Sequence, residues 1–482
     1  MKKKILFTVI VMVLSAGKVC ADRNDAPVPV RALIHLNSVI STGDYSPEQL
    51  VAMAATRGIN AVFLTENLAP QWEYGLFPFR NIVKRNVRLS SLTEYGFDEY
   101  YRRLSEIEKQ KQDMTVLMSA EVAPFYYWTG SPFGKEGLTL NDWDIQFIVA
   151  GMAPGDYGAI PTVSNGGFLY YGLKSFGMLW PFVLAASGIF FLKKKSSLIC
   201  LPDIFCYGLI LAGILFAAHY FPFTQARYDQ YHGKAGKGPY QEVIDYVNSK
   251  GGMTFWSSPE SSVDERKGDV GYAAGNAKKY MEECLDYTGF CCFYEGYRDI
   301  GGPGGVWDKL LVEYCGGGRA KPVWAIGEMS YHSKKDAGGK DIDEVQTVFI
   351  ARANTRPDIL EAMKNGRMYA LRRSADLRLD LDHFNVEASD GKYAVMGQEI
   401  LSRGPVKIHF GVSWTGISGD GVRAKLIRNG EIIKEFVLSC PGEFIFEDSF
   451  YTPGAKVYYR LDARGKYPCM LFSNPVFVRF KA

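Results

Sequence analysis

Polar side chains follow two short apolar segments near the start of the chain. In proteins with alternating strands and helices, residues that directly follow a strand often carry the functional groups. His35-Leu36-Asn37 comes after the apolar run Arg31–Ile34, and Thr65-Glu66-Asn67 comes after the run Ala61–Leu64. A β/α barrel builds its active site from residues at the carboxyl ends of its strands. The imidazole, amide and carboxylate groups of these two sets are therefore candidate functional groups.

The segment between the two runs predicts the helix that positions them. Ser46 is a typical N-cap, Pro47 suits the first helical position, and Glu48 places an acid in the first turn. Leu50 and the apolar residues after it recur at helical spacing, and Gly58 ends the helix. Strand, helix and strand form a β-α-β unit that brings both polar sets to one edge.

This opening resembles that of the PHP family, which is named for polymerases and histidinol phosphatases. Members begin with a strand ending His-x-His-Ser/Thr, continue with a Ser-Pro-Glu-Glu-Leu helix start, and have a second strand ending Thr-Asp-His-Asn. The corresponding segments here are His35-Leu36-Asn37-Ser38, Ser46-Pro47-Glu48-Gln49-Leu50 and Thr65-Glu66-Asn67. The resemblance implies an α/β fold, a distorted seven-stranded β/α barrel followed by the all-β sandwich of secreted members.

The same resemblance assigns the metal-binding positions. PHP hydrolases hold two or three divalent ions with a histidine-rich set; the ions clamp a phosphate or similar oxyanion and activate a water. The matched ligands are His35, Glu121 at the end of the predicted strand Thr115–Ala120, and His332. Asn37, Asn67 and Ser258 stand where the family has histidines, and Ser330 stands where it has an aspartate. The carboxylates expected nearby are Asp44, Glu66, Glu295 and Glu328.

These degenerate motifs leave two functions open. Asn offers a weak neutral oxygen and Ser is a poor ligand, so affinity for zinc-like ions falls. Three protein ligands can still hold one ion. The first hypothesis is a metal-dependent, phosphoesterase-type hydrolase with a reduced site for one Mn, Mg or Zn ion. The alternative is a catalytically inactive PHP-like scaffold, a pseudoenzyme without metal, which binds an envelope ligand or partner.

Two features predict an exported membrane protein. Residues 1–21 have the basic start, apolar core and small-residue end of a secretory signal peptide; an uncleaved anchor helix is the alternative. Ser175–Leu192 and Ile204–Ala218 are apolar runs near the length that spans a bilayer, and Lys193-Lys194-Lys195 lies between them. The positive-inside bias places these lysines in the cytoplasm and both soluble parts outside it. The alternative is a helical hairpin buried in a soluble core.

Patterning divides the chain into five segments. From Leu377 the apolar period changes to two, with a hairpin signal at Arg428-Asn429-Gly430-Glu431. A net charge of +3 with mixed signs gives no case for nucleic acid binding. The chain has nine cysteines, and export would permit a disulfide between Cys440 and Cys469. The segments are a signal peptide (1–21), the first part of the barrel (22–166), a transmembrane hairpin (167–221), the second part of the barrel (222–374) and a β-sandwich (375–482).

The place of the hairpin predicts which way the candidate site faces. The hairpin follows the predicted strand Ile145–Met152 and precedes the predicted helix Pro239–Lys250. It therefore occupies a strand-to-helix loop, and such loops lie on the face of a β/α barrel that carries active sites. We expect the site to face the membrane and its ligand to be a lipid headgroup or a lipid-linked envelope precursor.

The predicted topology is directly testable in cells. Reporters fused within 22–166 or after Ala482 should be active on the periplasmic side, and a reporter placed at Lys193–Lys195 should be active in the cytoplasm, because two independent signals agree on this orientation. Activity of the Ala482 fusion in the cytoplasm alone would contradict it.

Overall fold

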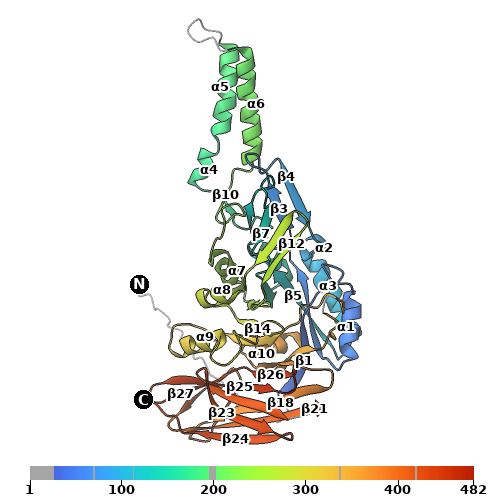
Figure 1. Cartoon of the computed structure of the whole chain (residues 1–482), viewed down its shortest axis with the longest axis vertical. Helices are drawn as coiled ribbons and strands as arrows, with labels where there is room; N and C mark the ends of the chain where they lie inside the picture. The colour runs from blue at the N-terminus through green and yellow to red at the C-terminus, as the bar shows by residue number, and fades with distance from the viewer. Residues whose placement is uncertain (1–26, 69–70, 112, 195–201, 336–337, 418–420) are drawn as a thin grey trace, which may run out of the picture.

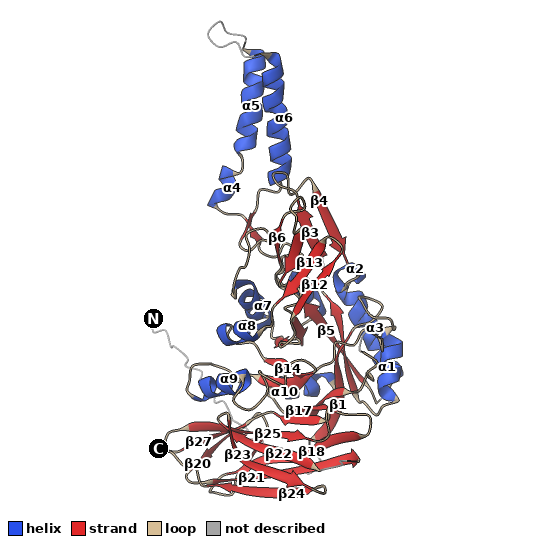
Figure 2. Ribbon diagram, in the orientation of Figure 1, coloured by secondary structure: helices blue, strands red, loops and turns tan. Residues whose placement is uncertain are grey.

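The computed structural model describes residues 27–68, 71–111, 113–194, 202–335, 338–417 and 421–482. An apolar helix pair projects from one end of an elongated molecule, a mixed α/β body lies in the middle, and a β-rich part forms the other end (Figure 1). Figure 2 shows that helices flank the sheet of the body, while the far end consists of strands. The predicted signal peptide, residues 1–21, and Lys195 lie outside the described residues.

The body is organised around a mixed sheet. β1, β2 and β5 run parallel, β11, β14 and β15 also run parallel, and β8 joins the two groups by pairing antiparallel with β5 and β11. β16 and β17 continue the sheet beside β1. The strands are β1 (Val28–Leu36), β2 (Ala61–Asn67), β5 (Thr115–Val122), β8 (Phe147–Ala150), β11 (Met253–Trp256), β14 (Gly289–Phe293), β15 (Trp324–Gly327), β16 (Val345–Ala351) and β17 (Met368–Arg372).

The structure refines the predicted barrel. In the described residues the ladder has two ends, β15 and β23 (Glu431–Leu438), so pairing alone does not close it. The curled sheet meets itself where Leu36 forms an isolated parallel bridge with Tyr331. This bridge brings the polar residues after β1 beside those after β15.

Helices cover the sheet, and local signals define their ends. The capping box predicted for α1 (Pro47–Ala55) is present: Gln49 N donates to Ser46 Oγ over 3.2 Å, and Ser46 N donates to Gln49 Oε1 over 2.8 Å. The remaining helices of the body are α2 (Leu92–Tyr95), α3 (Phe97–Gln110), α7 (Gly238–Ser249), α8 (Lys278–Glu283), α9 (Val306–Cys315) and α10 (Arg356–Lys364).

One sequence interpretation was wrong in detail, and one segment without a predicted element has a hairpin. Between Asn67 and Gly96 lies a hairpin of β3 (Gln71–Gly75) and β4 (Lys84–Arg88). The strand expected at Ile145–Met152 is the short β8, and its carboxyl end lies opposite those of its neighbours because it runs antiparallel. The predicted transmembrane hairpin, residues 167–221, therefore does not directly follow the carboxyl-terminal face of the sheet.

The chain nevertheless returns to that face before the apolar helices begin. After the 3₁₀ helix Pro154–Ala159, Thr162 and Ser164 line the same cavity as His332. Over the carboxyl ends of the strands lie the β3–β4 hairpin and a four-stranded sheet of β6 (Tyr127–Gly130), β7 (Leu138–Asn141), β12 (Val263–Lys267) and β13 (Val270–Ala274). In Figure 1 these strands lie between the body and the helix pair.

The projecting helices are long and apolar enough to cross a bilayer. The spans are Leu173–Lys193, made of α4 (Leu173–Gly177) and α5 (Trp180–Lys193), and α6 (Asp203–Tyr220), with mean hydropathies of 1.8 and 1.6. Short strands β9 (Leu169–Tyr170) and β10 (Gln225–Ala226) pair at their base. Gly213 packs so closely that an added Cβ would lie 2.7 Å from Ala185 Cβ. Small residues at a helix contact are typical of membrane helix pairs.

The β-rich part continues the sheet of the body through β17 and packs a second sheet against it. The first sheet contains β20 (Glu399–Ser402), β22 (Val422–Arg428), β23, β25 (Lys456–Arg464), β26 (Met470–Ser473) and β27 (Val476–Phe480). The second contains β18 (Leu377–Glu387), β19 (Tyr393–Val395), β21 (Val406–Gly416) and β24 (Gly442–Asp448). The described cysteines, Cys440 and Cys469 included, are free.

A buried ion pair joins the two parts. Arg460 on β25 donates from Nε and Nη2 to the carboxylate of Asp308 on α9, each over 2.6 Å, and Tyr458 donates to the same carboxylate over 2.7 Å. Both charged side chains are buried. The Asn474 amide donates to the carbonyls of Ala325 and Met368, which adds a second point of attachment.

Replacing one member of this pair should destabilise the protein strongly. Asp308→Ala leaves Arg460 buried and unpaired, and we expect a loss of about 3–5 kcal/mol in the free energy of unfolding. Thermal unfolding of the full chain in detergent measures the change. Glu99→Ala, which breaks an exposed ion pair with Arg102, is the matched control and should change the midpoint little. Equal midpoints for both variants would contradict the assigned role.

Candidate functional site

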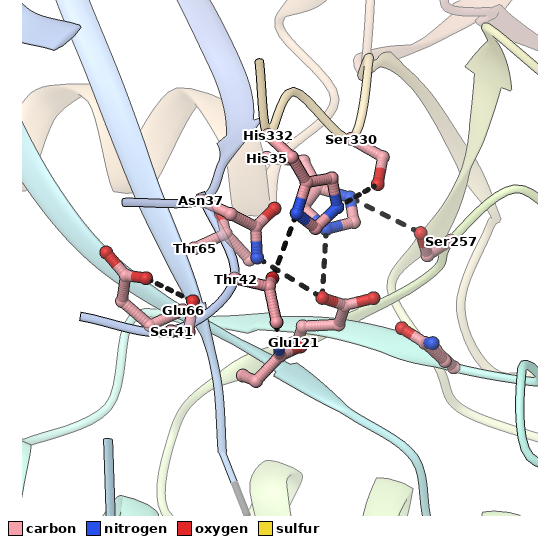
Figure 3. Close-up of polar contacts among 12 residues, drawn as sticks. His35, Asn37, Ser41, Thr42, Thr65, Glu66, Glu121, Ser257, Ser330 and His332 are labelled. Carbon is pink, nitrogen blue, oxygen red and sulfur yellow. Dashed lines mark hydrogen bonds and ion pairs between the residues drawn. The ribbon is translucent and has the colours of Figure 1, made fainter. Parts of the chain in front are cut away.

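The candidate site centres on a buried histidine between two carboxylates. His35 lies near the end of β1, and its Nδ1 contacts the carboxylate of Glu328, which follows β15. Its Nε2 lies 3.4 Å from Oε2 of Glu121 at the end of β5. His35 and Glu328 are each 1% exposed. Figure 3 shows His35 above Glu121 with Asn37 beside them.

Glu328 is held by several donors besides His35. Ser257 Oγ, Ser258 N and Ser258 Oγ, all after β11, donate to its Oε1 over 2.9–3.1 Å. Charge-assisted hydrogen bonds of this kind stabilise a buried carboxylate. The network thus joins the ends of β1, β5, β11 and β15.

His332 lies at the same edge but has different partners. Its Nδ1 lies 2.9 Å from Thr42 Oγ1, and its Nε2 lies 3.4 Å from Ser330 Oγ. Asn67 Nδ2 donates to the same Thr42 hydroxyl over 3.1 Å. His332 and Glu121 line one cavity, so the structure brings all three predicted ligands to one region.

Three of the other predicted candidates have separate surroundings. Glu66 is buried and accepts hydrogen bonds from Ser38 N, Ser41 Oγ and Tyr100 OH, which is a structural arrangement. Asp44 is exposed, and its main-chain N–H donates to the carbonyl of His332 over 3.0 Å. Glu295 lines a neighbouring cavity beside Ser258 and Ser330.

Backbone strain concentrates around Glu328. His35, Ser258 and Ser330 adopt φ angles of +70°, +40° and +46°, which place non-glycine residues in the left-handed region. Such conformations cost roughly 1–3 kcal/mol each, and they cluster at functional sites. The strain therefore supports a functional role for this edge of the sheet.

The carboxylates determine the charge of His35. Burial alone lowers the pKa of the imidazole, but the charges of Glu328 and Glu121 outweigh it and raise the pKa to about 10. Although burial favours the neutral form of Glu121, His35 holds the pKa of this carboxyl below its usual value. His35 is therefore a cation that partly neutralises two buried anions.

The pKa of Asp144, a residue that the sequence analysis did not identify, is shifted in the opposite direction to that of Glu121. Burial and the nearby charge of Glu121 raise its pKa to about 7. It precedes β8, so the antiparallel direction of that strand puts its amino end, and Asp144, at the site. Strand ends of a parallel sheet point only to residues that follow a strand, whereas Asp144 precedes one, so this pattern does not indicate it.

Two adjoining cavities of about 300 Å³ each form a divided cleft at this edge, called here the mouth cleft. Both are lined by Glu121, Asp144, Gln146 and Ser330. Trp72 and Trp143 give the first cavity aromatic walls, with ring centroids 5.7 Å apart in an edge-to-face arrangement. Besides the two indoles, the neutral hydrogen-bonding side chains that line this cavity are Thr42, Asn67, Tyr126, Gln146, Thr162, Ser164 and Ser330.

The residues present do not fit the two- or three-ion centre that the resemblance implies. In the described part of the chain, no group of three or more His, Cys, Asp or Glu side chains is arranged to hold a metal ion. His35 faces a carboxylate with each ring nitrogen, and Glu66 is occupied by hydrogen bonds. The ligand roles assigned to His35, Glu121 and His332 stay predictions.

No protein-family model matches the sequence, and no curated protein matches it. Among solved structures, the chain is similar to a two-domain protein containing a predicted PHP-like metal-dependent phosphoesterase from Bacteroides vulgatus, with 12% identity, coverage of 90% of this chain and 91% of that one, and a TM-score of 0.35. It is also similar to an amidohydrolase from Chromobacterium violaceum, with 13% identity, coverage of 64% and 90%, and a TM-score of 0.26. These similarities are loose, so the function below rests on the residues of this chain.

The charge of His35 makes stability depend on pH in a defined direction. A raised pKa stabilises the folded state fully below the unfolded value of about 6.5, and this contribution is lost as the pH rises through about 10. The midpoint of thermal unfolding should fall between pH 7 and ~10, and the fall should be smaller in His35→Gln. His232→Gln, at an exposed histidine, is the control and should behave like the wild type. Equal pH profiles for wild type and His35→Gln would contradict a charged His35.

Proposed function

We propose that this protein is a membrane-anchored, extracytoplasmic, PHP-like protein that binds an uncharged, polyhydroxylated ligand, such as an envelope glycan, in its mouth cleft. The observation that carries the proposal is the chemistry of the cleft wall. Trp143 Nε1 and Gln146 Oε1 are buried and have no hydrogen-bond partner among the described residues. Buried polar groups are nearly always paired, so an unpaired donor and acceptor in a cleft favour a ligand that satisfies both.

The charge of the cleft argues against a phosphoester. Among the described residues that line the first cavity there is no lysine or arginine, whereas Glu121 and Asp144 are both present. Phosphate recognition relies on Arg, Lys or converging N–H groups. Lys340 in the second cavity lies 3.8 Å above the ring of Tyr294 and contacts its hydroxyl, so this cation already has a partner.

The flat aromatic walls favour a sugar over a small cation. Glu121 is already paired with His35, and burial together with the charge of Glu121 raises the pKa of Asp144 to about 7, which disfavours its charged form. Sugar rings present apolar C–H faces to aromatic side chains, and their hydroxyls both donate and accept hydrogen bonds. Trp72 and Trp143 with the neutral polar side chains offer both kinds of contact.

Exposure of the apolar helices supports the proposed anchoring. Only 17% and 11% of the two candidate spans are buried within the protein, whereas the core helix of a soluble protein is mostly buried. Both spans lie far from the amino terminus, which separates them from a signal sequence. In this proposal α5 and α6 cross the membrane and both soluble parts lie in the periplasm.

The second candidate is a metal-dependent hydrolase with one ion. His35 Nε2 and Asn37 Oδ1 are buried without a hydrogen-bond partner in the described residues. His35 Nε2 lies 3.4 Å from Oε2 of Glu121, at ion-pair distance, and Asn37 donates to the same carboxylate oxygen through its Nδ2. These three side chains would hold the ion, which would supply Lewis-acid activation of a water. Two strong donors and one amide oxygen make a weak site. Metal content separates the two candidates.

Binding should depend on the indole N–H of Trp143. Against an array of neutral oligosaccharides and their phosphorylated counterparts, the full chain in detergent should bind neutral members. Trp143→Phe removes one hydrogen bond of about 1 kcal/mol, so its Kd should rise roughly fivefold. Trp143→Ala also removes the ring and should raise the Kd further. Trp414→Phe in β21 is the control and should bind normally.

Two results would overturn this proposal. Selective binding of phosphorylated members would contradict an uncharged ligand. One Mn²⁺ or Zn²⁺ per purified chain, lost in Glu121→Gln together with hydrolytic turnover, would favour the one-ion hydrolase instead.

A further inference from the structure

An exposed apolar loop lies beside the candidate membrane spans. Residues 76–83 connect β3 to β4, and Phe77, Ile82 and Val83 within it are 75%, 43% and 51% exposed. The adjoining strand β4 is exposed along its whole length. Contiguous apolar exposure of this kind marks a surface that another phase or molecule covers.

The same loop contacts the outer end of α6. The ring of Phe79 packs against Phe216 and His219, with centroid distances of 5.3 and 6.3 Å. Asn81 Nδ2 donates to the carbonyl of His219 over 2.6 Å. In Figure 1 the β3–β4 hairpin reaches the base of the helix pair.

These contacts fix the height of the loop relative to the span. Phe216 lies four residues before Tyr220, the last residue of α6, which corresponds to about 6 Å along the helix axis. The 18 residues of α6 are about 27 Å long, close to the thickness of a hydrocarbon core. If α6 spans the hydrocarbon core, Phe79 therefore lies within about 6 Å of the boundary between acyl chains and headgroups, on the acyl side.

Positive charge accompanies the apolar tip. From Gln71 to Arg88 the hairpin carries Arg80, Lys84, Arg85 and Arg88 against a single carboxylate, Glu73. Lys84 pairs with Glu73 over 2.8 Å, and Arg80 lies 4.1 Å above the ring of Tyr231. Arg85 and Arg88 are exposed on β4. Apolar residues flanked by cations are typical of segments that lie in the interface of an anionic membrane.

We infer that the β3–β4 hairpin is a second membrane contact, which inserts the tip of the loop 76–83 into the outer boundary of the bilayer and places Arg85, which pairs with Tyr74 close to the tip, against anionic lipid headgroups. This inference rests on the proposed anchoring by α5 and α6. It commits to lipid as the occupant because the surface continues directly from the spans and has complementary charge.

The contact has a consequence for the mouth cleft. β3 also carries Trp72, which forms part of the cleft wall. The hairpin is held to the body by hydrogen bonds from Gly75 N to Tyr231 OH and from Trp128 Nε1 to the Glu73 carbonyl, each over 2.8 Å. An element that touches lipid at one end and ligand at the other holds the cleft close to the bilayer surface, where lipid-linked glycans are accessible.

Depth-dependent quenching tests the contact in the full chain. A Cys440→Ser background removes the cysteine that is exposed among the described residues, and Ile82→Cys carries a fluorescent label in nanodiscs of zwitterionic lipid with or without anionic lipid. Nitroxides near the headgroups should quench this label more strongly than nitroxides at the bilayer centre. Labels at Phe182→Cys on α5 and at Tyr393→Cys on β19 are the positive and negative controls, since both side chains are exposed.

The charge variants test the headgroup contact. Arg85→Glu should reduce quenching at position 82, and the reduction should be larger in anionic than in zwitterionic nanodiscs. Lys407→Glu on β21, an exposed cation of the β-rich part, should leave quenching unchanged.

The outcomes distinguish a failure of the hairpin contact from a failure of the proposed anchoring by α5 and α6. If position 182 is quenched and position 82 is not, the anchor holds and the hairpin contact is wrong. If neither position is quenched, the anchoring itself is wrong. A label at position 82 that is shielded from aqueous quencher only at high protein concentration would identify a second copy as the occupant and overturn the lipid assignment.

Discussion

The mouth of this protein depends on one buried pairing, the contact of His35 with Glu328 and Glu121. Three ionisable side chains removed from water must compensate one another, because an unpaired buried charge is costly. Their compensation requires the ends of β1, β5 and β15 to stay together, and Ser257 and Ser258 add the end of β11. The shape of the cleft follows from this requirement, and so does the left-handed backbone of the residues around it.

The elongated shape separates two kinds of interaction. At one end, Arg460, Asp308 and Asn474 hold the β-rich part against the body through buried charge and amide hydrogen bonds. At the other end, the β3–β4 hairpin meets the helix pair (Figure 2). Phe79 in the loop of this hairpin packs against Phe216 of α6. The cleft lies toward the second end, so in the proposed membrane orientation the β-rich part points away from the lipid.

The predicted helix start and the predicted apolar runs, which depend on neighbours in the sequence, match elements of the structure, whereas the strand predicted at Ile145–Met152 is shorter. The capping box of α1 needs only Ser46 and Gln49, and two apolar runs flanking three lysines need only length and composition. The ends of β2 and β5 were close to prediction because parallel strands buried on both faces are continuous apolar segments. Strand direction is different, because nothing within Phe147–Ala150 specifies an antiparallel partner.

The sequence by itself determined that His35 and Glu121 lie at strand ends, because each comes directly after an apolar run of residues. It also determined the apolar spans, whose length and composition are properties of single segments. Only the tertiary structure decided that Glu328, 293 residues from His35, is its partner, and that Trp143, Asp144 and Gln146 form the cleft wall. The physical reason is that register and direction are set by pairing between distant strands, and one antiparallel strand reverses which of its ends meets the site.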